Sequence, residues 1–269
     1  MTSPYSEILK RIGSAIDDAR AIFARFTPGA IDAEFKAGHD PVTQADRAID
    51  AVLRQNLIRQ GEGWLSEESV DDYSRLEKKR VWVVDPLDGT REFVKGIPEF
   101  CVSIGYVEDG RPVAGGIHNP ATNETFIGAV DAGVLYNGKP AASSSRSDLK
   151  DALTLASRSE VQRGEWKPFE NGPLQIRGMG SVAYKLALVA AGLADITFTL
   201  TPKNEWDVAA GVALVLSSGG FVATPEGTDF RGNNRNPLLS GLIASGPRLR
   251  KQLLALLEPH LNAAPHLKK

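Results

Sequence analysis

Apolar and polar residues along the first sixty positions follow the spacing of amphipathic helices. In the first segment the apolar side chains return every three or four residues, at Ile8, Ile12, Ile16, Ala19, Phe23 and Phe26. The second segment runs from Gln44 to about Gln60 and aligns Ala45, Ile49, Val52 and Leu57. Because a period near 3.6 places such residues on one face, the pattern predicts two helices, and Thr43 is placed to cap the second.

From residue 81 the pattern changes to short β-prone segments separated by turns. The segments are Val81–Val84, Cys101–Val107, Pro112–Ile117 and Thr125–Val130. Clusters such as Glu108-Asp109-Gly110 lie between them and favour tight turns. We therefore expect an antiparallel meander that is backed by the first two helices.

The second part of the chain follows a small, polar stretch, Ala141–Ser147, which we interpret as a subdomain boundary. We expect an N-terminal α+β half, residues 1–145, and a C-terminal α/β half, residues 146–269. In the second half, the pattern of apolar and polar residues predicts three strands and three helices. The strands are Leu153–Ser157, Asp195–Leu200 and Gly220–Thr224, and the helices are Ser181–Ala191, Trp206–Ser217 and Pro247–Leu257. This mixed order is typical of stacked layers of helices and sheets.

Composition narrows the classes of protein that the pattern allows. Hydrophobic residues make up 42% and charged residues 24%, as in globular domains, and the net charge of -2 argues against a nucleic-acid or polybasic membrane surface. Cys101 is the only cysteine, which excludes an internal disulfide and a cysteine zinc site. No apolar run approaches the roughly eighteen residues of a membrane span, and the amino terminus lacks a signal-peptide core. We expect a cytoplasmic protein.

Acidic residues cluster where the predicted elements begin or end. The clusters are Asp40–Asp46, Ser66–Ser69, Asp85–Thr90 and Glu205–Gly211. In the third, Asp85 and Asp88 directly follow a strand that looks buried. Two unpaired anions about 4 Å apart repel by roughly 4 kcal/mol at an effective dielectric near 20. Unless one carboxyl is protonated, a cation should lie between them, and a hard divalent ion such as magnesium suits oxygen ligands.

Gly89 and Thr90 add an anion site next to these acids. Glycine lets the backbone approach an anion closely, and the following residues begin a helical turn whose free N–H groups point outward. Phosphate is the simplest ligand that would use both the metal and the amides.

Two motifs carry a resemblance to a known family. Val-Trp-Val-Val-Asp-Pro-Leu-Asp-Gly-Thr-Arg-Glu-Phe at 81–93 and Trp-Asp-Val-Ala-Ala-Gly at 206–211, in this order with the other acids, resemble the inositol monophosphatase superfamily of lithium-sensitive phosphatases. The resemblance covers nearly the whole chain. It implies an α-β-α-β-α sandwich of the type shared with fructose-1,6-bisphosphatase, two or three Mg²⁺ ions, inhibition by Li⁺, and a homodimer.

The resemblance also implies a role for individual residues. Metal ligands would be Glu67, Asp85, the carbonyl of Leu87, Asp88 and Asp207. Catalytic residues would be Glu67, Thr90 and Asp46, which together orient and deprotonate the attacking water. Phosphate would meet the amides of Gly89 and Thr90, and Gly180, Ser181 and Lys203 are candidate substrate contacts.

Each acid also has a purely structural interpretation. Asp46 lies three residues after Thr43, so that the two could form a helix cap only. Asp207 begins a predicted helix, where an acid is favoured by the helix dipole. Glu67 could belong to a solvated loop, Asp85 and Asp88 to a proline-containing turn, and Ser181 could be an N-cap.

Two alternatives from other classes remain open. Leu87-Asp88-Gly89-Thr90 resembles the Asp-x-Asp-Gly-Thr motif of haloacid dehalogenase phosphatases, although two residues separate Asp85 from Asp88 here and one of them is Pro86. A non-catalytic regulator that binds a phosphometabolite is the other alternative. Loss of a metal ligand would be its expected sign, and the sequence shows none.

The substrate is predicted from the residues around the motifs. Thr90-Arg91-Glu92-Phe93 resembles the 3'(2'),5'-bisphosphate nucleotidases, and Leu200 stands where inositol enzymes place an acid that binds ring hydroxyls. Phe100–Gly105 and Tyr136–Pro140 resemble the inositol branch instead. Lys203, Arg177 and Lys185 are candidate contacts for a second phosphate. The lead hypothesis is hydrolysis of 3'-phosphoadenosine 5'-phosphate to AMP, with inositol 1-phosphate or broader sugar phosphates as the alternative.

Overall fold

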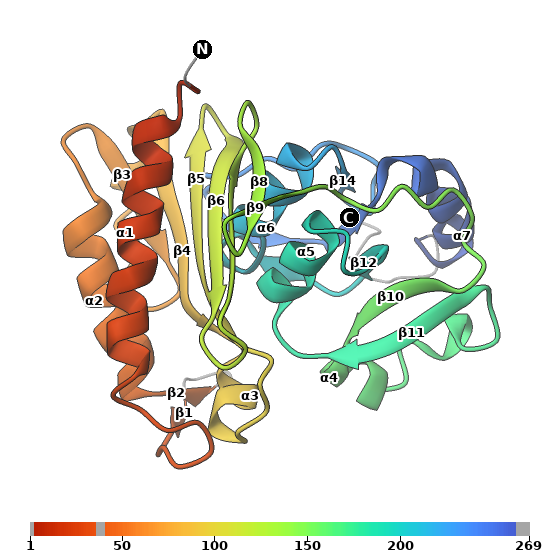
Figure 1. Cartoon of the computed structure of the whole chain (residues 1–269), viewed down its shortest axis with the longest axis horizontal. Coiled ribbons are helices and arrows are strands. Elements are labelled where there is room, and N and C mark those ends of the chain that lie inside the picture. Colours follow the sequence, from red (N-terminus) through yellow and green to blue (C-terminus); the bar gives the residue numbers. More distant parts are fainter. Residues whose placement is uncertain (1–2, 36–40, 262–269) are drawn as a thin grey trace.

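The computed structural model describes residues 3–35 and 41–261 and has the predicted α-β-α-β-α layers (Figure 1). Two helices cover the outer face of a seven-stranded sheet, two more separate it from a five-stranded sheet, and a C-terminal helix covers the far side of the second sheet. Within the described ranges, no helix combines the length and apolarity that crossing a bilayer requires. Asp40, predicted in the first acidic cluster, lies outside the described residues.

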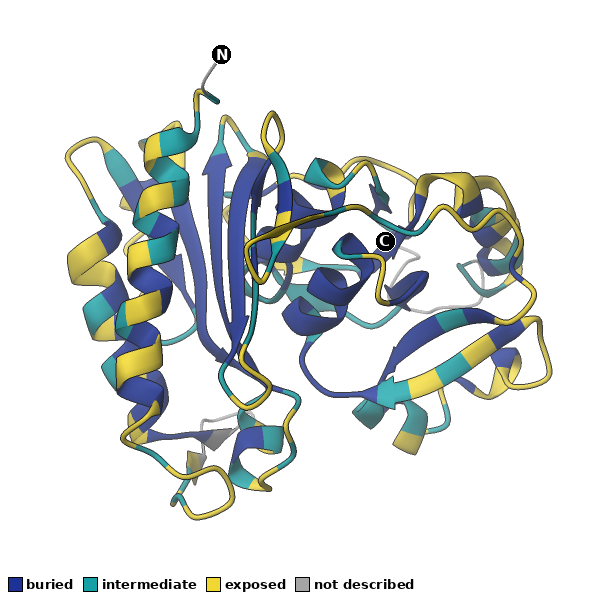
Figure 2. Ribbon diagram, in the orientation of Figure 1, coloured by how far each residue is buried: buried dark blue, intermediate teal, exposed yellow. Residues whose placement is uncertain are grey.

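The outer layer consists of α1 (Ser6–Phe23) and α2 (Gln44–Leu57), which confirms both predicted helices. The Thr43 hydroxyl accepts a hydrogen bond from the Ala45 N–H at 3.1 Å and so caps α2. Ile12 and Ile49 are fully buried against the sheet. Figure 2 shows buried inner faces and exposed outer faces on both helices, as their amphipathic patterns predict.

The first sheet has the strand order β3-β4-β5-β6-β7-β8-β9. Its strands are β3 (Glu62–Ser66), β4 (Arg80–Asp88), β5 (Cys101–Glu108), β6 (Arg111–Asn119), β7 (Glu124–Ala129), β8 (Gly133–Tyr136) and β9 (Lys139–Ala141). The predicted meander is confirmed in β4 to β7. The sequence analysis missed β3, which pairs parallel to β4, and the short hairpin of β8 and β9, because neither shows a run of β-prone residues.

The middle layer consists of α5 (Val182–Ala190) and α6 (Glu205–Ser217), both predicted. A Cβ atom on Gly105 or Gly115 would come within 2.9 or 2.5 Å of the Ala210 backbone, and one on Gly211 would lie 2.4 Å from Leu186. Glycine at these positions therefore lets α6 lie directly on the first sheet and close to α5. This matters because α6 carries Asp207.

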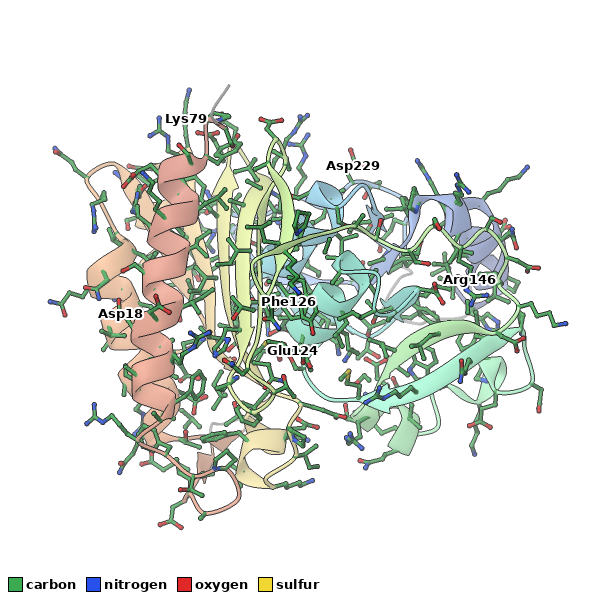
Figure 3. The ribbon with its side chains drawn as sticks, viewed as in Figure 1. Asp18, Lys79, Glu124, Phe126, Arg146 and Asp229 are labelled. Atoms are coloured by element: carbon green, nitrogen blue, oxygen red, sulfur yellow. The ribbon has the colours of Figure 1, made fainter. Side chains whose placement is uncertain are left out.

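Side chains of β7 join the first sheet to α5. Figure 3 places Glu124 and Phe126 at this junction. Glu124 accepts hydrogen bonds from the hydroxyls of Tyr184 and Tyr136, the latter at 2.8 Å. The Phe126 ring lies edge to face with Tyr184, with centroids 6.3 Å apart. These contacts hold the beginning of α5 against the sheet.

The second sheet has the order β11-β10-β12-β16-β14. Its strands are β10 (Ala152–Ser157), β11 (Leu174–Met179), β12 (Ile196–Thr199), β14 (Phe221–Ala223) and β16 (Leu242–Ser245). Three of them are predicted, whereas the edge strand β11 and the four-residue β16 are not. α7 (Arg250–Leu261) follows a short turn at Pro247–Leu249 and packs Leu253 and Leu257 on this sheet.

Short elements complete the described chain: β1 (Glu34–Phe35), β2 (Pro41–Val42), α3 (Thr90–Val94), α4 (Arg158–Gln162), β13 (Lys203–Asn204), β15 (Leu238–Leu239) and 3-10 turns at Ser74–Glu77 and Lys167–Phe169. The stretch 141–147 connects the two sheets. The predicted division of the chain into halves 1–145 and 146–269 stays a prediction. The helices of the middle layer, α5 and α6, belong to the second of these halves but share one core with the first sheet.

Candidate active site

Three carboxylates from separate segments meet at the carboxyl ends of β3 and β4. Glu67 follows β3, Asp85 lies in β4, and Asp207 lies in the first turn of α6. β3 and β4 run parallel, with Ser66 opposite Val84. Glu67, which follows β3, and Asp85 in β4 therefore lie at the same end of the sheet. One oxygen of each acid lies within 4.8 Å of the others.

A bulge in β4 shapes this edge. The sequence analysis predicted that this strand ends at Val84, whereas it continues to Asp88. Its register against β5 shifts between Asp85 and Asp88. The Leu87 N–H donates to the Asp85 carboxylate at 3.0 Å, and the Leu87 carbonyl accepts a hydrogen bond from the Thr90 hydroxyl at 2.9 Å. The two aspartates therefore belong to one distorted strand end.

Asp88 is held differently from Asp85. One of its oxygens accepts hydrogen bonds from the Ser181 hydroxyl and the Ala183 N–H, both at 2.6 Å. Among the described residues, it is not part of the close group of three acids. The expectation that a cation lies between Asp85 and Asp88 stays a prediction. The structure adds Glu67 and Asp207 as close partners of Asp85, because parallel pairing brings β3 beside β4 and α6 packs on the sheet.

Burial and mutual repulsion govern the charges in the site. Burial, with the neighbouring carboxylates next in importance, raises the pKa of Asp85 and of Asp207 well above the usual carboxyl range. Burial also raises the pKa of Asp88, but the bonds from Ser181 and Ala183 oppose this rise. A cation would relieve the repulsion, and a donor set of carboxylate oxygens fits a hard divalent ion such as Mg²⁺.

Asp46 makes both the helix-cap contact and the contact with Thr90 that the sequence analysis considered. One carboxylate oxygen accepts hydrogen bonds from the Thr43 N–H at 2.8 Å and the Thr43 hydroxyl at 2.6 Å, which completes the cap of α2. The other accepts one from the Thr90 hydroxyl at 3.1 Å. The predicted contact of Asp46 with Thr90 is present. The catalytic role of the pair stays a prediction.

Glycine is required where α3 begins. Gly89 has φ +98°, and a Cβ atom there would lie 2.7 Å from the Glu99 carbonyl oxygen. A Cβ atom on Gly180 would lie 2.5 Å from Glu92. The Ser181 hydroxyl accepts a hydrogen bond from the Tyr184 N–H at 3.0 Å, so that it is the N-cap of α5. Phosphate or substrate contacts of Gly89, Thr90, Gly180 and Ser181 stay predictions.

A cavity of about 300 Å³ opens beside the acids. Its lining includes every predicted metal ligand, Gly89, Thr90, Gly180, Ser181 and Lys203, together with Arg91, Arg158 and Lys185. Lys185 is only 4% exposed, and its ammonium donates to the Met179 carbonyl at 3.5 Å. Burial lowers the pKa of this lysine, although Asp88 and Glu160 oppose the change. Arg177 lies exposed on β11 and is not part of this lining.

Two charged residues near the cavity were missed by the sequence analysis. Arg158 contacts Glu99 and lies 3.8 Å from Glu92. Glu160, buried in α4, lies 3.1 Å from the Lys203 ammonium. Both stand in Ser157-Arg158-Ser159-Glu160, directly after a predicted strand. A polar run at a strand end is the signal that could have found them.

Comparison with known proteins adds an independent line of evidence. The chain matches the model of the inositol monophosphatase family over residues 4–262. It is 34% identical over 241 residues to an inositol monophosphatase of Mesembryanthemum crystallinum, which is 84% of this chain and 88% of the relative. It is 32% identical over 232 residues to a fructose-1,6-bisphosphatase/inositol-1-monophosphatase of Thermotoga maritima, covering 84% and 86%. The crystal structure of the extragenic suppressor protein suhB from Bartonella henselae matches with TM-score 0.79 and 30% identity, covering 94% of this chain and 99% of that one.

Proposed function

Because this chain belongs to the inositol monophosphatase family of phosphatases, we propose that it is a magnesium-dependent phosphomonoesterase that converts 3'-phosphoadenosine 5'-phosphate to AMP. The observation that carries this choice of substrate is the pair Lys185 and Lys203 in the wall of the cavity beside the acids. Ammonium groups outside the acidic cluster suit a substrate with a second anionic group, because they attract it without competing for the metal ligands.

The residues present fit the metal that the family uses. Glu67, Asp85 and Asp207 would hold Mg²⁺. Asp88 and Leu87 line the same cavity, and the Asp88 carboxylate and the Leu87 carbonyl would be further ligands for a second or third ion. Bound Mg²⁺ supplies Lewis-acid stabilisation of phosphoryl charge and lowers the pKa of water.

Proton handling is assigned to the side chains around Thr90. The Thr90 hydroxyl has one proton and two acceptors, the Asp46 carboxylate and the Leu87 carbonyl. Donation to either leaves the lone pairs of the Thr90 oxygen free to accept a hydrogen bond from the attacking water, which orients it. Glu67 accepts the proton that this water loses, while the Gly89 and Thr90 amides bind the phosphate. No covalent nucleophile is needed, and the family match removes the haloacid dehalogenase alternative.

Inositol 1-phosphate is the second candidate substrate, because the names of both curated relatives include inositol monophosphatase activity. The residues around position 200 oppose it. Leu200 has no acceptor for a ring hydroxyl, and the nearby acid, Glu160, is already bonded to Thr199, Trp166 and Lys203. Among the described residues, Glu160 is not part of the cavity lining.

A phosphate-release panel with Mg²⁺ tests the proposal. It compares 3'-phosphoadenosine 5'-phosphate, inositol 1-phosphate, fructose 1,6-bisphosphate and histidinol phosphate. We expect the highest kcat/KM for the nucleotide. A higher value for inositol 1-phosphate would replace the proposed substrate. Binding without release from any of the four would favour the non-catalytic regulator instead.

Three further features belong to the same proposal. Li⁺ should inhibit by displacing a metal ion, which a titration of the activity would show. A homodimer is expected, and light scattering of the purified protein measures it. A cytoplasmic location is the third, and cell fractionation tests it.

A further inference from the structure

We propose that Glu160 is a positioning residue that holds the Lys203 ammonium on the cavity wall, where Lys203 recognises the second anionic group of the substrate. The inference rests on the proposed function and deepens it, because it identifies how a doubly anionic nucleotide is distinguished from a simple phosphate monoester. Glu160 acts through Lys203 and is not part of the cavity lining among the described residues.

Glu160 is a buried acid whose two oxygens are both occupied. It lies in α4 and is 2% exposed. Its Oε2 accepts a hydrogen bond from the Trp166 indole N–H at 3.1 Å, and its Oε1 accepts one from the Thr199 hydroxyl at 2.6 Å. A carboxylate bonded from two sides by buried partners has a fixed position.

Lys203 completes this arrangement from the cavity side. Its Nζ lies 3.1 Å from the Oε1 of Glu160, and its side chain is 15% exposed. Its backbone is fixed by pairing with Leu239 in β15. Because the lysine stem has four rotatable bonds, an unpaired Lys203 would sample many positions. The Glu160 carboxylate limits it to one.

The arrangement is more specific than an ordinary surface ion pair. A buried carboxylate is costly unless it is paired and hydrogen-bonded, and here the paired cation lines the cavity that holds the metal-binding acids. Lys185 lines the same wall. The two lysines thus add cationic groups to a lining that also holds Arg91 and Arg158, and these groups can attract an anion.

The test uses two nucleotides that differ only in the second phosphate. The ratio of kcat/KM for 3'-phosphoadenosine 5'-phosphate to that for adenosine 3'-phosphate measures recognition of the 5'-phosphate. We expect E160Q and K203M each to lower this ratio about tenfold, the loss of one charge-assisted contact. The double variant should also lower it about tenfold and not a hundredfold, because Glu160 acts through Lys203.

E165Q is the matched control. Glu165 lies near Lys203 but pairs with Arg163 at 2.6 Å and Thr201 at 2.9 Å, so its loss should leave the ratio unchanged. W166F removes one bond to Glu160 and keeps its charge. It should lower the ratio two- to threefold, and it tests the inference even if E160Q fails to fold.

The outcomes separate the two claims. If the wild-type protein prefers the bisphosphate but E160Q and W166F keep that preference, the positioning role is wrong and the proposed function stands. The same conclusion follows if the effects of E160Q and K203M on the ratio multiply in the double variant. If the wild-type protein releases phosphate only from inositol 1-phosphate, the proposed substrate and the inference both fall. If no phosphate is released from any ester, the proposed enzymatic function itself fails.

Discussion

At the scale of single residues, the site brings together buried acids whose charges a bound cation would stabilise. Asp85 is 2% exposed and lies near Glu67 and Asp207. Folding therefore brings like charges together in a buried place, a cost that sequence-local contacts such as the Leu87 N–H offset only in part. The close approach of buried carboxylates therefore both suits the site to a cation and lowers the stability of the protein without one.

Asp85→Asn removes one of these charges without changing the shape. We expect kcat to fall by about a thousandfold, because several kcal/mol of metal-derived stabilisation are lost. In EDTA the variant should unfold at a higher denaturant concentration than the wild-type protein. Asp229→Asn is the control, because Asp229 is exposed and lies far from the site (Figure 3). Turnover near the wild-type rate at saturating Mg²⁺ would contradict the assignment.

His118 gives the protein a second pH-sensitive residue, away from the acids. Burial, together with the charge of Arg20, lowers its pKa to about 4. In the unfolded chain the imidazole binds a proton with a pKa near 6.5. The contribution of His118 to the free energy of unfolding is therefore complete above pH 6.5 and is lost as the pH falls toward 4. The loss amounts to about 3 kcal/mol.

Urea unfolding of the wild-type protein and His118→Gln at several pH values isolates this effect. The difference in unfolding free energy between the two proteins should shrink between pH 6.5 and 4, since all other groups titrate alike in both. A difference that is constant with pH would show that His118 is not held neutral.

At the scale of elements, the turn at Gly89 requires a backbone that only glycine adopts easily. Gly89 has φ +98° and lies against the Glu99 carbonyl, where a side chain has no room. The bulge of β4 and the beginning of α3 meet at this residue. A change here therefore alters both the acids before it and the amides after it.

Gly89→Ala should destabilise the protein and impair turnover, and Gly61→Ala separates the two causes. Gly61 has φ +89°, but a Cβ atom added there would meet no other atom within 4 Å, so both variants share the conformational cost of about 1–2 kcal/mol. Only Gly89→Ala adds the clash. We expect Gly61→Ala to keep its kcat, while Gly89→Ala loses at least tenfold. Equal activities would contradict the close approach.

At the scale of the whole molecule, the proposed metal site would link metal binding to folding. The candidate ligands Glu67, Asp85 and Asp207 lie after β3, in β4 and in α6, which belong to separate parts of the chain. The unfolded chain does not bring them together. Mg²⁺ should therefore stabilise the native protein by RT ln(1 + [Mg²⁺]/Kd), about 2.7 kcal/mol at a hundred times Kd.

Thermal unfolding at different pH values tests this linkage. In EDTA the raised pKa values of Asp85 and Asp207 mean that the native state binds more protons than the unfolded state. Stability should then fall as the pH rises above the ordinary carboxyl pKa near 4. Saturating Mg²⁺ should abolish this fall at neutral pH. Ca²⁺ or Zn²⁺ in place of Mg²⁺ shows which cation the site prefers, and no response to any of them would refute a metal site.

The sequence by itself determined the principal helices, the meander and the identity of the acids. Periodic apolar positions specify which face of α1 or α2 is buried, and the motifs at 81–93 and 206–211 name Asp85 and Asp207. These properties are local: they depend on spacing along the chain, and tertiary contacts did not overrule them.

Only the tertiary structure decided which acids face one another and what the lysines contact. Asp88 is a near neighbour of Asp85 in sequence, yet it bonds to the beginning of α5, while Glu67 reaches Asp85 through the parallel pairing of a strand that the sequence does not reveal. Glu160 meets Lys203 across 43 positions in the same way. Such contacts depend on strand order and helix packing, which are set by the burial of the whole core and leave no periodic signal along the chain.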